Sequence, residues 1–306
     1  MDEDIWTALR EATARLDAAH VDAPATTARL LLAHVLDRPK EWLIAHGDVK
    51  LDATAQQRFR SLLQRVIAHE PLAYVLGHRE FYGLDLIVDR RVLIPRPETE
   101  MLVELALNEL RIENEELRKS AGPDFSILNS QFSILDVGTG SGAIPIAIAT
   151  HAPDVRILAT DISTDALAVA RLNAERHGVA DRITLLQADL LDGIVALPPI
   201  ITANLPYVTR EEIEGLPPEI QAHEPRIALD GGEDGLALVR RLLEQIAARA
   251  ETHDHASLLR AAFLEIGASQ GPAALAAAQA ILPHAHAEIK KDLAGLDRVL
   301  AIHFHG

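Results

Sequence analysis

The first 75 residues carry apolar positions at helical spacing. In residues 25–36 and 53–70, apolar side chains recur every three or four positions, so that each segment has one apolar face. Pro39, Gly47 and Pro71 separate these segments from their neighbours. We therefore predict a small helical domain over residues 1–75.

The pattern changes after residue 80. Residues 81–94, FYGLDLIVDRRVLI, alternate partly between apolar and polar positions, which is typical of a short hairpin or connector. The following segment, IPRPETEMLVELALNEL, runs from a proline-stiffened loop into a helix that begins near Glu98 or Thr99. We assign residues 76–110 to a linker that contains the hairpin and the PRPETE segment.

From residue 133 onward, short apolar runs alternate with helical patterns, and this predicts a parallel sheet covered on both faces. The expected strands are residues 133–137, 155–161, 183–189, 200–204 and 261–267, and the expected helices are residues 143–151, 164–178, 235–250 and 272–283. Two closing strands, residues 286–292 and 298–304, can place one antiparallel strand at the end of the sheet. The fold class is thus α/β, a doubly wound domain over residues 111–306 behind the helical domain.

Residues 111–132 do not fit this alternation. They are mainly polar, and the tetrapeptide FSIL occurs at 125–128 and again at 132–135, where it leads into a strand. A duplicated insertion in a surface loop explains this most simply, because loops tolerate added residues well.

Composition narrows the class of protein. The 306 residues include no cysteine, which excludes disulfides and thiolate chemistry, and no apolar run is long enough to cross a membrane. The acidic, amphipathic N-terminus is unlike a signal peptide, so we expect a cytoplasmic protein. A formal net charge of −16 disfavours direct nucleic-acid binding. The histidines show no metal-ligand spacing, and we expect no metal.

A glycine-rich loop separates the first strand of the α/β domain from its first helix. In LDVGTGSGA, Gly138, Gly140 and Gly142 alternate with Thr139 and Ser141, where glycine allows a sharp turn and a close ligand. A tight turn without a ligand is the alternative.

Two acidic residues end the next strands and sharpen this interpretation. Asp161 follows Gly142 by 19 residues and suits two ribose hydroxyls, and Asp189 ends the third strand, where a helix cap is the alternative role. We predict an adenosine-bearing cofactor. The loop and Asp161 do not separate NAD from S-adenosylmethionine.

The fourth strand ends in Asn204, Leu205, Pro206 and Tyr207, and this tetrapeptide favours methyl transfer. Pro206 holds Leu205 extended, so the Asn204 side-chain oxygen and the Leu205 carbonyl can each accept one hydrogen of a planar NH2 group. Tyr207 can lay its ring against that group. The two acceptors stabilise the charge that develops when such a nitrogen attacks a sulfonium methyl, whereas hydride transfer has no need of them.

LDVGTGSGA, ATD, NLPY, PRPETE and HEPRIALDGGEDGL together resemble the HemK/PrmC family of protein-glutamine N5-methyltransferases, as do EPLAYVLGHREFYG and the tail DLAGLDRVLAIH. The resemblance spans nearly the whole chain apart from residues 111–132. It implies S-adenosylmethionine as cofactor and, as substrate, the glutamine of the Gly-Gly-Gln motif in class I peptide chain release factors. It also implies that the helical domain helps to dock the release factor.

The resemblance assigns roles to individual residues. Residues 138–142 would hold the methionine part of the cofactor and Asp161 the ribose, with Asp189 and Leu190 beside the adenine. Asn204 would contact cofactor and glutamine, Leu205, Pro206 and Tyr207 would complete the glutamine pocket, and Arg96 and Glu100 of PRPETE would bind substrate. The family usually has proline at position 205; leucine keeps the carbonyl, so we expect activity to survive.

Three other functions are alternatives to this one. A glutamine methyltransferase of a ribosomal protein is the nearest, and PRPETE argues against it only by resemblance. An amino-methyltransferase of nucleic-acid bases uses the same strand-end chemistry, but the net charge disfavours it. An inactive methyltransferase that serves as a binding protein would be expected to lack Asn204 or Tyr207, and both are present.

Overall fold

The computed structural model describes residues 3–121, 133–252 and 259–304, and it divides into two compact units. The first unit comprises Met1–His78 together with residues 217–223, and the second comprises Arg79–Leu216 and Glu224–Gly306. The first boundary lies close to the predicted end of the helical domain at residue 75. The sequence did not predict that residues 217–223 belong to the first unit, because this assignment depends on contacts between residues distant in sequence.

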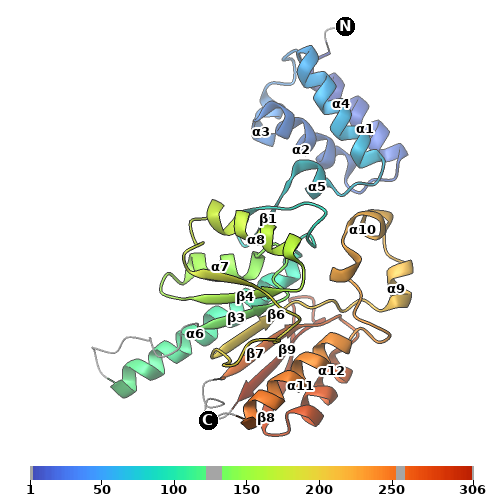
Figure 1. The fold of residues 1–306 in the computed structure, drawn as a ribbon. Helices are drawn as coiled ribbons and strands as arrows, with labels where there is room; N and C mark the ends of the chain where they lie inside the picture. Colours follow the sequence, from blue (N-terminus) through green and yellow to red (C-terminus); the bar gives the residue numbers. More distant parts are fainter. Residues whose placement is uncertain (1–2, 122–132, 253–258, 305–306) are drawn as a thin grey trace. The chain divides into compact units, whose positions relative to one another are not determined.

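The first unit is helical, as the apolar spacing predicts (Figure 1). Its helices are α1 (Ile5–Ala18), α2 (Pro24–Leu36), α3 (Lys40–Ala45), α4 (Ala53–Ile67), α5 (Leu72–Leu76) and α10 (Pro218–His223). Asp4 and Asp52 cap α1 and α4 by accepting from the N–H groups of Thr7 and Ala55. The apolar faces of α1, α2 and α4 meet in one core around side chains such as Phe59.

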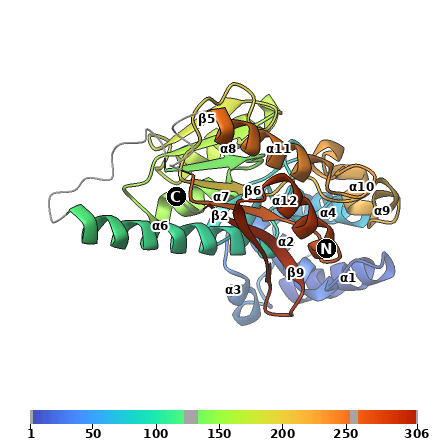
Figure 2. The same cartoon turned by 90° about the horizontal axis from the view of Figure 1, so that it is seen from below.

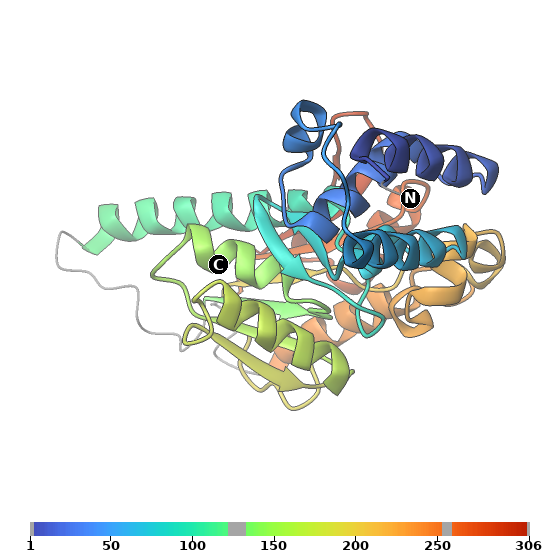
Figure 3. The ribbon, with the colours of Figure 1, turned by 90° about the horizontal axis from the view of Figure 1, so that it is seen from above.

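A hairpin of β1 (His78–Phe81) and β2 (Leu84–Ile87) leads into the second unit, followed by a 3₁₀ turn η1 (Pro97–Thr99) and α6 (Glu100–Ala121). Figures 2 and 3 show α6 as a long helix. The sequence analysis placed residues 111–121 in a loop, but they continue α6. Strong helix formers such as Glu, Leu, Arg, Lys and Ala dominate there. Because most of these residues are polar, the segment lacks the apolar spacing by which a helix is recognised. The rest of the predicted insertion, residues 122–132, lies outside the described residues.

The second unit contains a seven-stranded sheet in the order β5-β4-β3-β6-β7-β9-β8. The strands are β3 (Ile134–Val137), β4 (Ile157–Asp161), β5 (Ile183–Gln187), β6 (Ile200–Ala203), β7 (Ala261–Glu265), β8 (Ala285–Lys291) and β9 (Asp297–Phe304). β3 to β7 are parallel, and β9 runs antiparallel to both of its neighbours. The predicted doubly wound sheet with an antiparallel closing strand is confirmed.

Successive residues of β3 pack into different cores, because side chains alternate across a sheet. Ile134 belongs to the core formed with α6, α7 (Ala143–His151) and α8 (Thr164–Arg176), whereas Leu135 belongs to the core formed with α11 (Ala237–Thr252) and α12 (Gly271–Ile281). The remaining elements, α9 (Arg210–Glu214) and η2 (Arg226–Ala228), follow β6. Among the described residues, no helix is both long and apolar enough to cross a membrane.

The strand register brings three chain segments to one edge of the sheet. Val137, the last residue of β3, pairs with Thr160 of β4 on one side and with Ala203 of β6 on the other. The residues that follow these three are Gly138, Asp161 and Asn204. The glycine loop, the strand-terminal carboxylate and the strand-terminal amide are therefore neighbours at the carboxyl edge, where α/β sheets bind ligands.

Candidate active site

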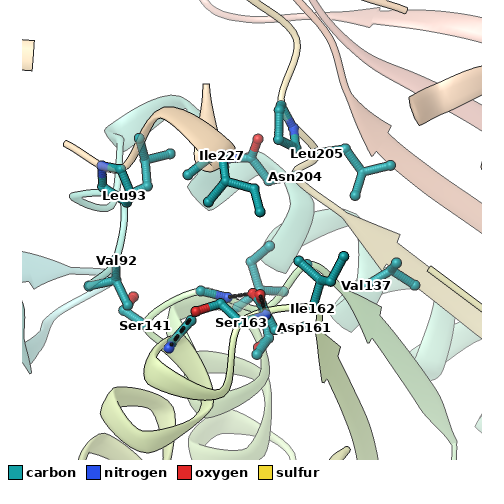
Figure 4. A pocket seen from close by; sticks show the side chains of 18 of the residues that line it. Val92, Leu93, Val137, Ser141, Asp161, Ile162, Ser163, Asn204, Leu205 and Ile227 are labelled. Carbon is teal, nitrogen blue, oxygen red and sulfur yellow. Dashed lines mark hydrogen bonds between the residues drawn. The ribbon is translucent and has the colours of Figure 1, made fainter. Parts of the chain in front are cut away.

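A cavity of about 230 Å³ opens at this edge. Figure 4 shows Asn204 and Leu205 on one side of it and Asp161 and Ser163 on the other. Of the predicted site residues, those that line the cavity are Gly138, Thr139, Gly140, Ser141, Asp161, Asp189, Leu190, Asn204, Leu205, Pro206 and Arg96. Gly142, Tyr207 and Glu100 are not among the lining residues. Most of the predicted set is thus brought together at one place.

The glycine loop turns through left-handed backbone conformations that favour glycine. The φ angles are +75° at Gly138, +55° at Gly140 and +81° at Gly142. At Gly142, which precedes α7, a Cβ atom would lie 3.2 Å from the Ala170 Cβ. Gly142 therefore lets α7 approach α8, and the loop lines the cavity through the residues before it.

Asp161 ties the loop to the end of β4. One carboxylate oxygen accepts from the Gly140 N–H at 2.8 Å and the other from the Ser163 N–H at 2.9 Å. Burial raises the pKa of Asp161, and the bonds from the Ser163 and Gly140 N–H groups oppose that rise. A carboxylate oxygen has a second acceptor site, so both oxygens keep a lone pair for the hydroxyls of a diol.

Two exposed apolar side chains also line the cavity. Ile162 is 49% exposed and Ile227 is 60% exposed although both line the cavity, so a bound ring would cover apolar surface that is otherwise in water. Sequence analysis missed both residues; the signal for Ile162 was an apolar residue directly after the strand-terminal Asp161. Leu190 lines the same cavity and is buried, with a left-handed φ of +54°.

Three charged residues of the predicted site, Asp189, Arg96 and Glu100, form ion pairs or hydrogen bonds within the protein. Asp189 accepts from Arg241 at 3.0 Å, and Arg96 pairs at 2.6 Å with Glu224, which is buried. Glu100 accepts from the Tyr82 N–H at 2.9 Å and so fixes the turn between β1 and β2. The substrate roles expected for Arg96 and Glu100 stay predictions.

Asn204 is held by a residue that the sequence analysis did not assign to the site. Its Nδ2 donates to the Thr99 Oγ1 at 2.9 Å, and Thr99 is the last residue of the 3₁₀ turn formed by PRPETE. Thr99 is 4% exposed and lines the cavity. Because Nδ2 is engaged on the Thr99 side, the Oδ1 of Asn204 lies at the opposite corner of the amide and is available to a hydrogen-bond donor.

Leu205 and Pro206 line the cavity beside Asn204, and the leucine packs onto the glycine loop. A Cβ atom at Gly138 would lie 3.2 Å from the Leu205 Cδ2. Leu205 is 4% exposed, so the residue that replaces the usual proline is accommodated in the core rather than in solvent. The strand-end tetrapeptide and the glycine loop are therefore one packed unit.

Tyr207 is fixed at both ends, by the last residue of β7 and by the turn that joins β7 to α12. Its hydroxyl donates to the Glu265 Oε1 at 3.2 Å, and its carbonyl accepts from the Gln270 Nε2 at 2.8 Å. Burial, with the nearby charge of Glu265, raises the pKa of the Tyr207 phenol. Glu265 is 2% exposed, and burial raises its pKa to about 7. A lone carboxylate in the otherwise apolar strand AAFLE was the sequence signal for it.

A second buried carboxylate lies under the glycine loop. Asp136, the third residue of β3, is 1% exposed and accepts from the Thr202 hydroxyl at 2.8 Å through Oδ1. Burial raises its pKa to about 6, against the effects of Thr139 and Thr202. The sequence analysis did not single it out. No group of three or more His, Cys, Asp or Glu side chains that could hold a metal ion occurs in the described ranges.

Residues 7–77 match the PrmC N-terminal domain, and residues 134–220 match a methyltransferase domain. A release factor glutamine methyltransferase of Moorella thermoacetica is 39% identical over 295 residues, which cover 95% of each chain. Another protein with that name, from Nitratidesulfovibrio vulgaris, is 36% identical over 298 residues, or 95% of this chain and 92% of the relative.

One solved structure, the hMettl16 catalytic domain in complex with the MAT2A 3'UTR hairpin 6, superposes with a TM-score of 0.53. It is 18% identical and covers 78% of this chain and 82% of that chain, so it shows the fold alone. The family follows from the two relatives, whose identity extends over both units of the chain. The chain belongs to the release factor glutamine methyltransferases.

Proposed function

We propose that this chain transfers a methyl group from S-adenosylmethionine to the side-chain amide nitrogen (N5) of the glutamine in the Gly-Gly-Gln motif of class I peptide chain release factors. The observation that carries the proposal is Asn204, whose amide is oriented by Thr99 on a cavity that also contains Asp161 and the glycine loop. The two relatives named release factor glutamine methyltransferase support this substrate.

The cavity suits S-adenosylmethionine in the character of its lining. Asp161 offers carboxylate lone pairs to ribose hydroxyls, Ile162 and Ile227 offer apolar surface to adenine, and Gly138 and Gly140 let the backbone approach the methionine part. When bound, this cofactor supplies an electrophilic methyl group on a sulfonium, so the protein needs no strong base of its own.

The protein's part is to hold a poor nucleophile in place. The lone pair of a glutamine amide nitrogen is delocalised, and two acceptors aimed at its hydrogens stabilise the positive charge that grows on it. Asn204 Oδ1 is one acceptor, because Nδ2 is taken by Thr99, and the carbonyl of Leu205 is the other. Holding nitrogen, methyl carbon and sulfur in line supplies the entropic part of the acceleration.

The first unit offers a surface for the release factor itself. A hollow between α1, α2 and α3 is lined by Trp6 and Ile44, which are 55% and 57% exposed, together with Leu9 and Leu43. Exposed aromatic and aliphatic side chains beside a hollow are common at protein interfaces. We place the reaction in the cytoplasm, where release factors act in translation termination.

The central test combines the full chain, S-adenosylmethionine and purified class I release factor, with mass spectrometry of the Gly-Gly-Gln peptide. We expect one methyl group on the glutamine. A parallel incubation with ribosomal proteins tests the alternative substrate: methylation there and none on the release factor would refute the proposal.

Asn204→Ala tests the site assignment. Loss of an acceptor that acts on the developing charge lowers kcat, by about a hundredfold or more, while cofactor affinity changes much less. Asn108→Ala, on the exposed side of α6, is the matched control and should behave as the parent protein does. Full turnover of the Asn204 variant would contradict the role assigned to it.

A further inference from the structure

Behind Asn204 and Tyr207 lies a buried carboxylate that the reaction as described does not use. Glu265 ends β7, is 2% exposed, and does not line the cavity. Its Oε1 accepts from the Tyr207 hydroxyl at 3.2 Å. Its Oε2 is also buried and has no hydrogen-bond partner among the described residues. An unsatisfied carboxylate oxygen in the interior is costly, so its position calls for an explanation.

Thr99 is the neighbour that connects Glu265 to the substrate side. Of the surrounding groups, the Thr99 hydroxyl has the largest effect in lowering the pKa of Glu265, ahead of Tyr207. The same hydroxyl oxygen accepts from the Asn204 Nδ2 at 2.9 Å. The Thr99 hydroxyl thus has a proton left to donate to the unpaired Oε2 of Glu265, while its oxygen accepts from the amide that faces the cavity.

A threonine hydroxyl has one proton, and this fixes the direction of the bonds around it. If the proton of Thr99 points to the Glu265 carboxylate, the oxygen can only accept from Asn204. Asn204 must then present Nδ2 to Thr99 and Oδ1 to the cavity. Reversing the Thr99 hydroxyl would bring Oδ1 to Thr99 and present Nδ2, a donor, to a substrate NH2 group that has only hydrogens to offer.

We propose that Glu265 is a positioning residue for methyl transfer: its carboxylate takes the hydroxyl protons of Tyr207 and Thr99, and Thr99 in turn orients the Asn204 amide with its oxygen toward the substrate. This role rests on the proposed function. Glu265 touches neither substrate nor cofactor. It acts through the two hydroxyls, and through Thr99 it sets the hydrogen-bond direction at the glutamine site.

The surroundings of Glu265 make its charge sensitive to pH near neutrality. Burial and the charge of Glu98 raise its pKa to about 7, against the opposing effects of Thr99, Tyr207 and Arg298. Protonation would give the carboxyl a donor of its own and remove the demand on the Thr99 proton. The orientation of Asn204 is therefore best enforced above pH 7, and kcat should rise with pH through that region.

The test measures kcat and KM for the release factor in the full chain and in Glu265→Gln, an isosteric change that introduces a donor beside Thr99. We expect kcat to fall by about tenfold to a hundredfold, the range produced by misplacing a reacting group, with the dissociation constant of S-adenosylmethionine within about twofold. The rise of kcat near pH 7 should disappear. Glu175→Gln, an exposed glutamate of α8, is the matched control and should keep both.

Substitutions of Thr99 separate positioning from general support of the fold. Thr99→Val removes the hydroxyl at similar shape and should lower kcat by a similar factor of about tenfold or more, whereas Thr99→Ser should restore it. In the Thr99→Val background, adding Glu265→Gln should cost little further, because both act through one hydroxyl. Thr99→Val and Thr99→Ser both keep the native Glu265, so their comparison remains decisive even if Glu265→Gln fails to fold.

Two results would overturn the positioning role: a kcat and pH profile of Glu265→Gln equal to those of the parent, or losses in Glu265→Gln and Thr99→Val that simply multiply. An active parent with such variants overturns this role alone. A parent protein that leaves the release factor unmethylated overturns the proposed function, and the positioning role with it.

Discussion

The carboxylate of Asp161 both fixes the backbone around it and is available to bind a ligand. It accepts from the N–H groups of Gly140 and Ser163, which fixes the glycine loop against the turn after β4, and it keeps lone pairs for a ligand diol. Loop shape and ligand binding therefore depend on the same two oxygen atoms. The sequence predicted the ligand role from the position of Asp161 at a strand end; the tie to Gly140 became visible only in the fold.

Asp161→Ala should weaken binding of S-adenosylmethionine by about a hundredfold, because two hydrogen bonds to a charged acceptor and those to the ligand are lost together. Isothermal titration calorimetry measures this loss directly. Asp181→Ala, at an exposed position before β5, is the control and should bind as the parent does. An unchanged dissociation constant for Asp161→Ala would contradict the assignment of the ribose site.

Glu265 also leaves a signature in the stability of the protein. Its pKa is about 7 in the folded chain against 4.5 as a free side chain, so between these values the folded state binds more protons than the unfolded state. The free energy of unfolding therefore falls as pH rises from about 4.5 and levels off above about 7. Asp136 contributes in the same direction but only up to about pH 6.

Urea unfolding at pH 6 and pH 8 isolates this effect. The parent protein should lose about 1 kcal/mol more than Glu265→Gln between the two pH values, since one pH unit across a shifted titration corresponds to about 1.4 kcal/mol. The comparison uses the difference between the two proteins, which removes the titration of histidines common to both. Equal pH dependence in the two would show that Glu265 is not protonated at pH 6.

At the scale of elements, the loop after η2 supports the strand-end tetrapeptide by close packing. A Cβ atom at Gly231 would lie 2.7 Å from the carbonyl oxygen of Pro206, and one at Gly235 would overlap the carbonyl oxygen of Tyr207 and the amide of Gln270. The Gly231 N–H also donates to the Val208 carbonyl at 2.9 Å. The motif LDGGEDGL thus accompanies NLPY because the two segments pack backbone to backbone.

Gly235→Ala should lower kcat by about tenfold or more, because the added methyl group displaces Tyr207 and breaks the Gln270 bond that holds its carbonyl. Gly295→Ala is the matched control. Both glycines have positive φ, +73° and +79°, but a Cβ atom at Gly295 meets nothing within 4 Å. The control should therefore lose only about 1 kcal/mol of stability to backbone strain and keep its kcat. Equal kcat losses in both variants would remove the packing explanation.

The element pattern was largely predictable and the supporting contacts were not. Alternating apolar runs identified the strands of the sheet and the main helices, because burial on both faces leaves a strong hydrophobic signal. Residues 111–121 were misplaced because a polar helix resembles a polar loop in composition. Thr99 and Glu265 were not predicted, because their roles depend on contacts between residues distant in sequence. Thr99 contacts Asn204, 105 residues away, and Glu265 contacts Tyr207, 58 residues away.

At the scale of the whole molecule, one unit carries the chemistry and the other is proposed to recognise the protein substrate. Trp6 and Ile44 are exposed on the first unit, whereas the cavity is lined by residues of the second unit. Trp6→Ala combined with Ile44→Ser should raise KM for the intact release factor by about tenfold and leave kcat unchanged, because two apolar side chains that binding would bury are removed.

A short peptide that contains the Gly-Gly-Gln sequence provides the control for this prediction. It reaches the cavity without the surface of the first unit, so the double variant and the parent should use it equally well in steady-state assays. Exposed Leu172→Ser, on α8 of the second unit, controls for the loss of an exposed apolar side chain. A parent-like KM for the release factor in the double variant would place the docking surface elsewhere.

The contact of Leu205 with Gly138 has an evolutionary consequence. A side chain at Gly138 would be strained, because the φ angle there is +75° and a Cβ atom would lie 3.2 Å from the Leu205 Cδ2. Any drift in the size of this pair must therefore occur at position 205, and a β-branched residue in place of the flexible leucine would bear directly on the glycine loop. The glycine loop, a separate motif in the sequence, thus limits which residues can follow Asn204.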